Sequence, residues 1–281
     1  MPFSDAQIAE RMAEWPKYYL NREVQLGATA TMVNFGDPNS GKLNATTFTG
    51  RKFNASGLSP VWTPSSALSG WATPFDLRGP ANWQGVAPVL TFNGTSEEAD
   101  TPDADYWTRV ETAAFSIGAW VWPTDITNVV LLSKWDETTG AQLREWLFWI
   151  DGNSKLKLNI YDESANIDVN RPSSTTIVAN QWQFVVVTYT GDGGADAADS
   201  INLYINGTVG NGTASNNASY VAMENLSTVT RLGFNKGAAA NANFFAGKML
   251  GGSFCPFFVQ AELTLEQVKN MYEFERKGLG V

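Results

Sequence analysis

The sequence predicts an all-β protein that folds as an antiparallel β-sandwich. Apolar and polar residues alternate in the stretches 155–160 and 201–205, which is the period of a strand with one face in water. The stretch WQFVVVTY at 182–189 is rich in β-branched and aromatic residues, as strands are. The turn sequences DGN at 151–153 and NG at 206–207 separate such stretches. Short strands spaced in this way favour a sandwich or a barrel.

Two further stretches, 115–122 and 146–150, are apolar at both alternating positions. A strand with only one buried face would carry polar residues at every second position. We therefore expect these two strands to lie in the centre of a sheet or beneath another layer.

The composition excludes several kinds of chemistry. The 281 residues contain no histidine, which removes histidine general bases, Ser-His-Asp triads and most transition-metal sites. Cys255 is the single cysteine and lies in an apolar stretch, so we expect a buried, inert thiol. The formal net charge of −9 would repel nucleic acid and anionic lipid surfaces. Nucleic acid is therefore not an expected partner.

No apolar stretch of the sequence approaches the roughly 20 residues that a membrane-spanning helix needs. The opening residues, MPFSDAQIAERMAEW, carry charges where a signal peptide needs an apolar stretch. We therefore expect no membrane span, and a chain made in the cytoplasm without an export signal.

The chain divides into residues 1–88, an N-terminal helix with an irregular docking arm, and residues 89–281, the sandwich. The helix is predicted to begin at Ser4, with a capping box to Gln7, and to end before Pro16. Prolines then interrupt the rest of the arm. Two alternatives remain open, because the arm can pack on its own sandwich or dock on a partner. The residues expected to dock are Ile8, Met12 and Trp15.

A second short helix is predicted near the end of the chain. Thr264 and Gln267 have the spacing of a capping box, and Leu263 and Val268 that of a hydrophobic staple. This helix is expected to run through Met271 and to lie against the sandwich.

Eight short stretches of the second segment follow one another in the order of the strands and the last helix of a known family. Together they cover residues 89–272, and they resemble the laminin-G-like or concanavalin A-like jelly rolls. The resemblance implies a lectin-type antiparallel β-sandwich with a short C-terminal helix. The stretches are VLTFNGT at 89–95, AFSIGAWVWP at 114–123, LLSKWD at 131–136, ANQWQFVVVTYTG at 179–191, INLYINGTV at 201–209, RLGF at 231–234, FFAGKM at 244–249 and LTLEQVKNMY at 263–272.

Members of that family often bind calcium and glycans, so the resemblance implies both as ligands. Where the family has aspartate in its opening turn and in its final strand, this sequence has Asn93 and Leu250. Calcium takes six to eight oxygen ligands, so these two changes weaken the carried-over site. Asp100, Asp103 and Asp105 crowd the loop after the opening strand and could rebuild it, as could Asp192, Asp196 and Asp199. No cofactor is expected from the sequence, because acidic loops are more often simply solvated. The candidate calcium ligands are Asn93, Asp100, Asp103 and Asp105.

Some relatives with this fold hydrolyse glycosidic bonds with carboxylates spaced E-x-D-x-x-E on one strand. The sequence has no such spacing. Glu145 and Asp151 flank the apolar stretch 146–150, but they stand six residues apart and across a turn. We therefore expect a protein that is not an enzyme.

Taken together, these features favour a structural protein on the surface of a virion, as a capsid decoration or fibre component that displays a lectin-like sandwich. Its expected partners are other structural subunits, in a homo-oligomer, and surface glycans. The alternative is a carbohydrate-binding lectin module, which would be extracellular, and a divergent glycoside hydrolase is a remote third reading. Three residues near predicted loop ends, Trp107, Trp135 and Asp136, are the candidate ligand-binding residues, with core packing as their alternative role.

Overall fold

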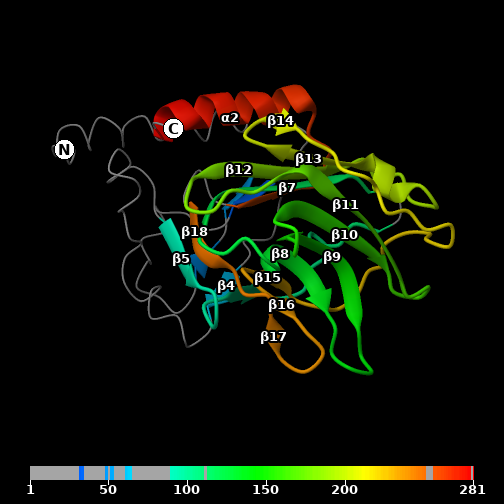
Figure 1. Cartoon of the computed structure of the whole chain (residues 1–281). Helices are drawn as coiled ribbons and strands as arrows, with labels where there is room; N and C mark the ends of the chain where they lie inside the picture. The colour runs from blue at the N-terminus through cyan, green and yellow to red at the C-terminus, as the bar shows by residue number, and fades with distance from the viewer. Residues whose placement is uncertain are drawn as a thin grey trace.

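A computed structural model describes residues 32–34, 48–49, 51–53, 61–64, 89–110, 113–250, 256–279 and 281. Two antiparallel sheets stack face to face, and the helix α2 (Leu265–Leu279) lies outside one of them (Figure 1). The predicted all-β sandwich is therefore confirmed. No helix in these ranges has the length and the apolar character that crossing a membrane requires.

The first sheet is the one that α2 covers. Its strands follow the order β14-β13-β12-β7-β19-β1-β3, and β18 joins β5 to β7 beside this row. The long central strand β7 pairs with the whole length of β12 through its residues 115–121. The strands are β14 (Thr208–Val209), β13 (Ile201–Ile205), β12 (Gln183–Tyr189), β7 (Phe115–Pro123), β19 (Phe257–Val259), β1 (Met32–Asn34), β3 (Arg51–Phe53), β18 (Ala246–Leu250) and β5 (Val89–Asn93).

The second sheet has the order β11-β10-β9-β8-β15-β6-β4-β2, with the hairpin β16-β17 attached to the end of β8. Long antiparallel ladders join β8, β9, β10 and β11. The strands are β11 (Ile167–Thr176), β10 (Lys155–Asp162), β9 (Leu143–Ile150), β8 (Val129–Asp136), β15 (Thr230–Leu232), β6 (Ala99–Thr101), β4 (Val61–Pro64), β2 (Phe48–Thr49), β16 (Asn235–Lys236) and β17 (Asn241–Ala242), and a short 3-10 helix, η2 (Ala197–Ser200), precedes β13.

The segment before residue 89 takes part in both sheets. Strands β1 and β3 extend the first sheet through β19, and β4 extends the second sheet through β6. The arm predicted as irregular therefore contains short strands that pair with the sandwich of the same chain. The predicted helix with Ile8, Met12 and Trp15 lies outside the described residues, and the boundary between residues 88 and 89 stays a prediction.

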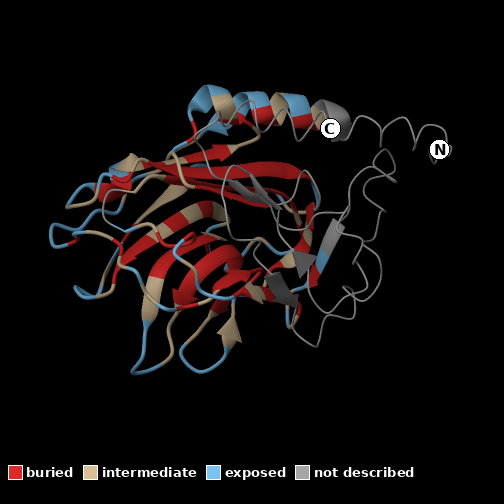
Figure 2. Ribbon diagram, turned by 180° about the vertical axis from the view of Figure 1, so that it is seen from behind, coloured by how far each residue is buried: buried red, intermediate tan, exposed pale blue. Residues whose placement is uncertain are grey.

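The main core lies between the two sheets and is lined by alternate residues of each strand, such as Leu156, Leu158 and Ile160 of β10 (Figure 2). The alternation predicted for this stretch is confirmed. A second apolar layer lies between the first sheet and α2, where Phe184 of β12 packs in one cluster with Val268. Because core lies on both sides of β7 and β12, these strands are apolar at both alternating positions.

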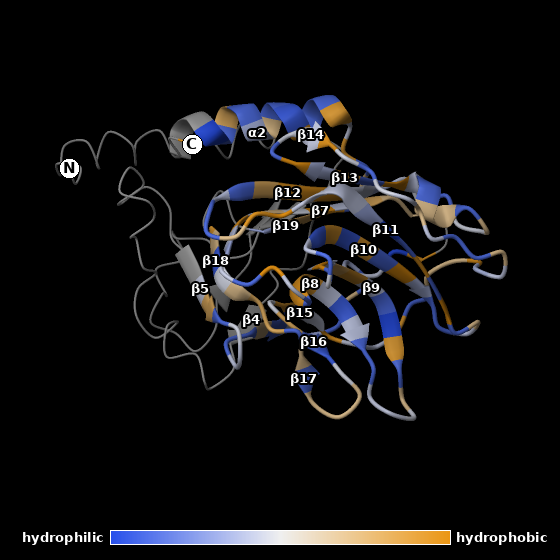
Figure 3. Ribbon diagram, in the orientation of Figure 1, coloured by the Kyte–Doolittle hydropathy of each residue, from blue (hydrophilic) through white to orange (hydrophobic). Residues whose placement is uncertain are grey.

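The capping box of α2 forms as predicted. The backbone N–H of Gln267 donates to Oγ1 of Thr264 at 3.2 Å, and the N–H of Thr264 donates to Oε1 of Gln267 at 2.8 Å. The helix runs past the predicted end, and its buried Glu275 accepts a 2.7 Å hydrogen bond from Nε1 of Trp120 in β7. Hydrophilic residues predominate along the rest of α2 (Figure 3), as expected of a helix that is half in water.

Candidate functional site

A small aromatic cluster lies on the face of the second sheet that is turned away from the main core. It contains Trp135 of β8, Tyr161 of β10 and the partly buried Trp149 of β9, with Val130 and Leu147 between them. The strand register explains this arrangement, because Val130 lies opposite Trp149. We call this group the outer strip.

Trp149 stands at the more polar end of the outer strip. Its Nε1 donates to Oδ1 of Asn159 at 2.8 Å, and the amide of Asn159 donates in turn to Asp168 at 3.0 Å. Asn170 donates to the same carboxylate oxygen at 2.8 Å. Nζ of Lys157 lies 5.7 Å from the centre of the indole ring. A partly buried indole therefore lies beside amides, a carboxylate and an ammonium group, which is the mixture that orients a polar ligand with an apolar face.

The other end of the outer strip is closed by a charged pair. Arg144 lies over the ring of Tyr161, 3.8 Å from its centre, and makes two hydrogen bonds of 2.9 and 2.7 Å to the carboxylate of Glu163. These hydrogen bonds raise the pKa of the Arg144 guanidinium, and burial raises the pKa of the Tyr161 phenol. Tyr161 meets Trp135 edge to face, with 5.2 Å between ring centres. The double hydrogen bond between Arg144 and Glu163 holds the guanidinium over the ring of Tyr161. The more accessible end of the outer strip is therefore the one with Trp149.

The three predicted ligand-binding residues occupy different places. Trp135 belongs to the outer strip, but its side chain is only 5% exposed. Asp136 binds Arg231 through Oδ2 at 3.0 Å and accepts hydrogen bonds from Thr138 through Oδ1, so both of its oxygens are used within the protein. Trp107 lies in the main core and is 2% exposed, so neither face of its ring is open to a ligand.

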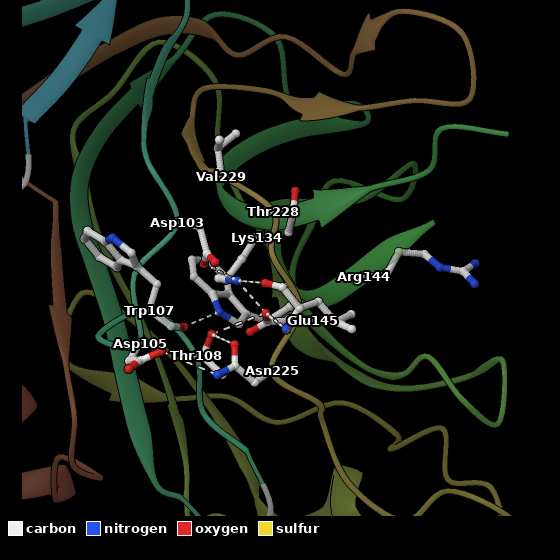
Figure 4. A network of polar contacts seen from close by, with 12 residues as sticks. Asp103, Asp105, Trp107, Thr108, Lys134, Arg144, Glu145, Asn225, Thr228 and Val229 are labelled. Atoms are coloured by element: carbon white, nitrogen blue, oxygen red, sulfur yellow. Dashed lines mark hydrogen bonds and ion pairs between the residues drawn. The ribbon is translucent and has the colours of Figure 1, made fainter. Parts of the chain in front are cut away.

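A buried polar network lies on the inner side of the same sheet, at one end of the sandwich (Figure 4). The ladder between β8 and β9 pairs Lys134 with Trp146 and Trp135 with Arg144, so Glu145 is an extra residue, a β-bulge. The side chains of Lys134 and Glu145 are both completely buried, and Nζ lies 2.5 Å from Oε1. A bulge thus brings a carboxylate to a lysine inside the protein.

Two loops complete the network. Asp103, from the loop after β6, places Oδ1 3.0 Å from Nζ of Lys134. The loop before β15 contributes the N–H of Leu226, which donates to Glu145 Oε1 at 2.9 Å, and the carbonyl of Leu226, which accepts from Lys134. The hydroxyl of Thr108 also faces Glu145, at 3.3 Å. Burial outweighs these partners and raises the pKa of Glu145 to about 7.

The four residues predicted to bind calcium do not form a metal site in the described structure. Oδ1 of Asn93 accepts three backbone N–H groups of its own turn. Asp103 pairs with Lys134, and Asp105 accepts a hydrogen bond from Asn225. Burial raises the pKa of Asp100. Within the ranges that the structure describes, no three acidic or thiol side chains gather as a metal ion requires.

Sequence reasoning missed Trp149, Asn159 and Lys157 as members of one site. The available signal was the hairpin turn at 151–153, which pairs Lys157 with Trp149 across two adjacent strands. It also missed the pairing of Lys134 with Glu145, because nothing in the sequence marks the bulge.

The two stacked antiparallel sheets define a jelly roll of the lectin type. Residues 93–250 match the family described as the Concanavalin A-like lectin/glucanases superfamily. The chain belongs to this superfamily, and the resemblance seen in the sequence is confirmed.

Solved structures support the fold. The binding domain of botulinum neurotoxin serotype D is 12% identical, with a TM-score of 0.53, over 90% of this chain and 53% of that one. A structure described by the words "Cell entry of botulinum neurotoxin type C is dependent upon interaction with two ganglioside molecules" is 12% identical, with a TM-score of 0.51, over 88% and 51%. The chain thus spans about half the length of these neighbours. No curated protein sequence matches it.

Proposed function

We propose that this chain is a binding module without catalytic activity, and that it holds a carbohydrate on the outer strip. The observation that carries the proposal is Trp149, whose partly buried indole lies beside Asn159, Asp168 and Lys157. The C–H face of a sugar ring packs on an indole, and its hydroxyl groups need donors and acceptors at the ring edge. The superfamily includes lectins by name, and the neurotoxin type C structure concerns gangliosides, which agrees with this ligand class.

Burial of the candidate acid argues against hydrolysis. Glu145 has a pKa of about 7, which suits an acid–base group, but its side chain is completely buried beneath the loops. A polysaccharide therefore cannot reach it without opening of the network. Asp151, the carboxylate that follows β9, accepts hydrogen bonds from the backbone of its own turn.

The test is a glycan array with purified protein, followed by titration calorimetry with the best ligand. Trp149→Ala should weaken binding by roughly tenfold, since a lost stacking contact costs about 1.4 kcal/mol. Trp122→Ala is the matched control, because Trp122 is also partly buried but lies on the first sheet. The proposal fails if the protein binds no glycan on the array, or if Trp149→Ala and Trp122→Ala weaken binding equally.

The setting that we propose for this module is the surface of a virion, as a homo-oligomeric decoration or fibre component. The sequence supports it through the absence of histidine and of a paired acid motif. Light scattering of the full chain should give a defined oligomer, and deletion of residues 1–20 should reduce it to a monomer if the arm docks. A truncated chain that forms the same oligomer as the full chain would exclude docking by the predicted N-terminal helix.

A further inference from the structure

We propose that Lys134 and Asp103 become joined by an intramolecular isopeptide bond, with Glu145 as the group that moves the protons. The ammonium nitrogen of Lys134 lies between the two carboxylates, 2.5 Å from Glu145 and 3.0 Å from Asp103 (Figure 4). The bond would tie the loop after β6 to the strand β8. This inference does not depend on carbohydrate binding.

Burial is the first argument for a reaction at this place. Lys134 and Glu145 have no exposed side-chain surface, and such groups are costly to bury as ions. Condensation of the Lys134 ammonium with the carboxylate of Asp103 replaces one buried cation and one partly exposed anion with a neutral amide. Asp103 is 35% exposed, so the water that the reaction releases has a way out.

The second argument is the state of Glu145. A group that transfers protons works best when its pKa lies near the ambient pH, and burial raises the pKa of Glu145 to about 7. Its Oε1 is held by Lys134 and by the N–H of Leu226, whereas its Oε2 is buried and has no hydrogen-bond partner among the described residues. Oε2 can therefore hold a proton while Oε1 stays in contact with Lys134.

The step balances without any oxidant or cofactor. Glu145 takes a proton from the Lys134 ammonium and passes it to the carboxylate of Asp103. The neutral amine attacks Cγ of Asp103 and forms a C–N bond. Glu145 then moves a second proton from nitrogen to the departing hydroxyl, the C–O bond breaks, and water leaves. The products are a neutral amide and one water molecule, and Glu145 ends as the carboxylate that it was.

Proximity lowers the barrier to the reaction between the amine and the acid, which is high when both are free in water. Two groups that a fold holds in contact reach effective molarities of roughly 10⁵–10⁸ M. The surrounding side chains hold this geometry: Nε1 of Trp146 donates to the carbonyl of Trp107 at 2.9 Å, which fixes the loop that carries Asp103 against β9. The reacting atoms are therefore positioned by packed aromatic residues on both sides.

The experiment is intact-mass spectrometry of the full, denatured chain. The expected mass is lower than that of the sequence by one water molecule, and a tryptic digest should contain a branched peptide that joins Lys134 to Asp103. A chain with the full mass of its sequence would overturn the proposal, whether or not any variant folds.

Four substitutions assign the bond. Lys134→Arg keeps the charge but lacks the nucleophile, and Glu145→Gln keeps the shape but cannot relay protons, so both should have the full mass. Asp103→Asn should lose ammonia in place of water. Asp105→Asn, a control at a carboxylate two residues away, should still lose water.

Two outcomes would contradict the proposal. Water loss that persists in Lys134→Arg would indicate a succinimide and overturn the bond. An isopeptide bond that forms in Glu145→Gln would overturn the role of Glu145.

Discussion

The buried carboxyl of Glu145 predicts a specific dependence of stability on pH. The test compares Asp103→Ala with Asp103→Ala/Glu145→Gln, because neither chain has an aspartate that could react with Lys134. Burial, which raises the pKa of Glu145, and the contacts with Lys134 and Leu226, which lower it, all remain in the first variant. All other titrating groups are shared, so their effects cancel in the difference between the two chains.

The sign follows from the raised pKa. Folding raises the pKa of Glu145 from its ordinary value of 4.5 to about 7, so the folded state holds the proton more tightly. The stability that this proton provides is complete below pH 4.5 and is lost as the pH rises through about 7. A difference of about 2.5 pKa units corresponds to about 3 kcal/mol, at about 1.36 kcal/mol per unit.

The assay is urea unfolding followed by tryptophan fluorescence, at several values from about pH 4 to about pH 8, where carboxyl groups titrate. Asp103→Ala should lose about 3 kcal/mol of unfolding free energy relative to the double variant across this window. Parallel pH profiles for the two chains would refute the reasoning, because they would mean that Glu145 titrates alike in the folded and unfolded states.

Three further substitutions test the packing around the sandwich by thermal or urea unfolding. Gly118→Ala should destabilise the fold by about 1–3 kcal/mol, because its Cβ would lie 2.4 Å from the ring of Phe257; an unchanged midpoint would show that the ring can move. Thr264→Ala should cost about 1 kcal/mol by removing the cap of α2, and a matched Thr264→Ser should retain most of it. Glu275→Ala should cost about 1–3 kcal/mol by leaving Nε1 of Trp120 without this acceptor, and a smaller cost than that of Thr264→Ala would contradict the assignment.

The strands that could be predicted are those whose pattern is local. The stretches 155–160 and 182–189 carry their own periodicity or β-branched residues, and the capping box of α2 lies within four residues. The short strands at 32–34 and 61–64 could not be predicted in the same way. They pair with β19 and with β6, which lie far along the chain, and such pairing is set by the assembled sheet and not by local sequence.

The candidate site was predicted only in part, for a related reason. Trp135 was singled out because it stands near a predicted loop end, whereas Trp149 stands in a stretch without alternation. Asp103 was singled out as an oxygen ligand for calcium, and its carboxylate instead meets the ammonium group of Lys134. The sequence shows how many charges a loop carries. It does not show which buried residue will pair with one of those charges.

The bulge at Glu145 links the two faces of the second sheet. In a regular strand, residues 144 and 146 would point to the same side. Here Arg144 lies over Tyr161 on the outer strip, while Trp146 lies in the main core. One extra residue therefore keeps the arginine outside, keeps the tryptophan inside, and leaves a carboxylate beside Lys134 at the end of the core. A single irregularity in β9 thus shapes the proposed binding surface and also creates the proposed reactive group behind it.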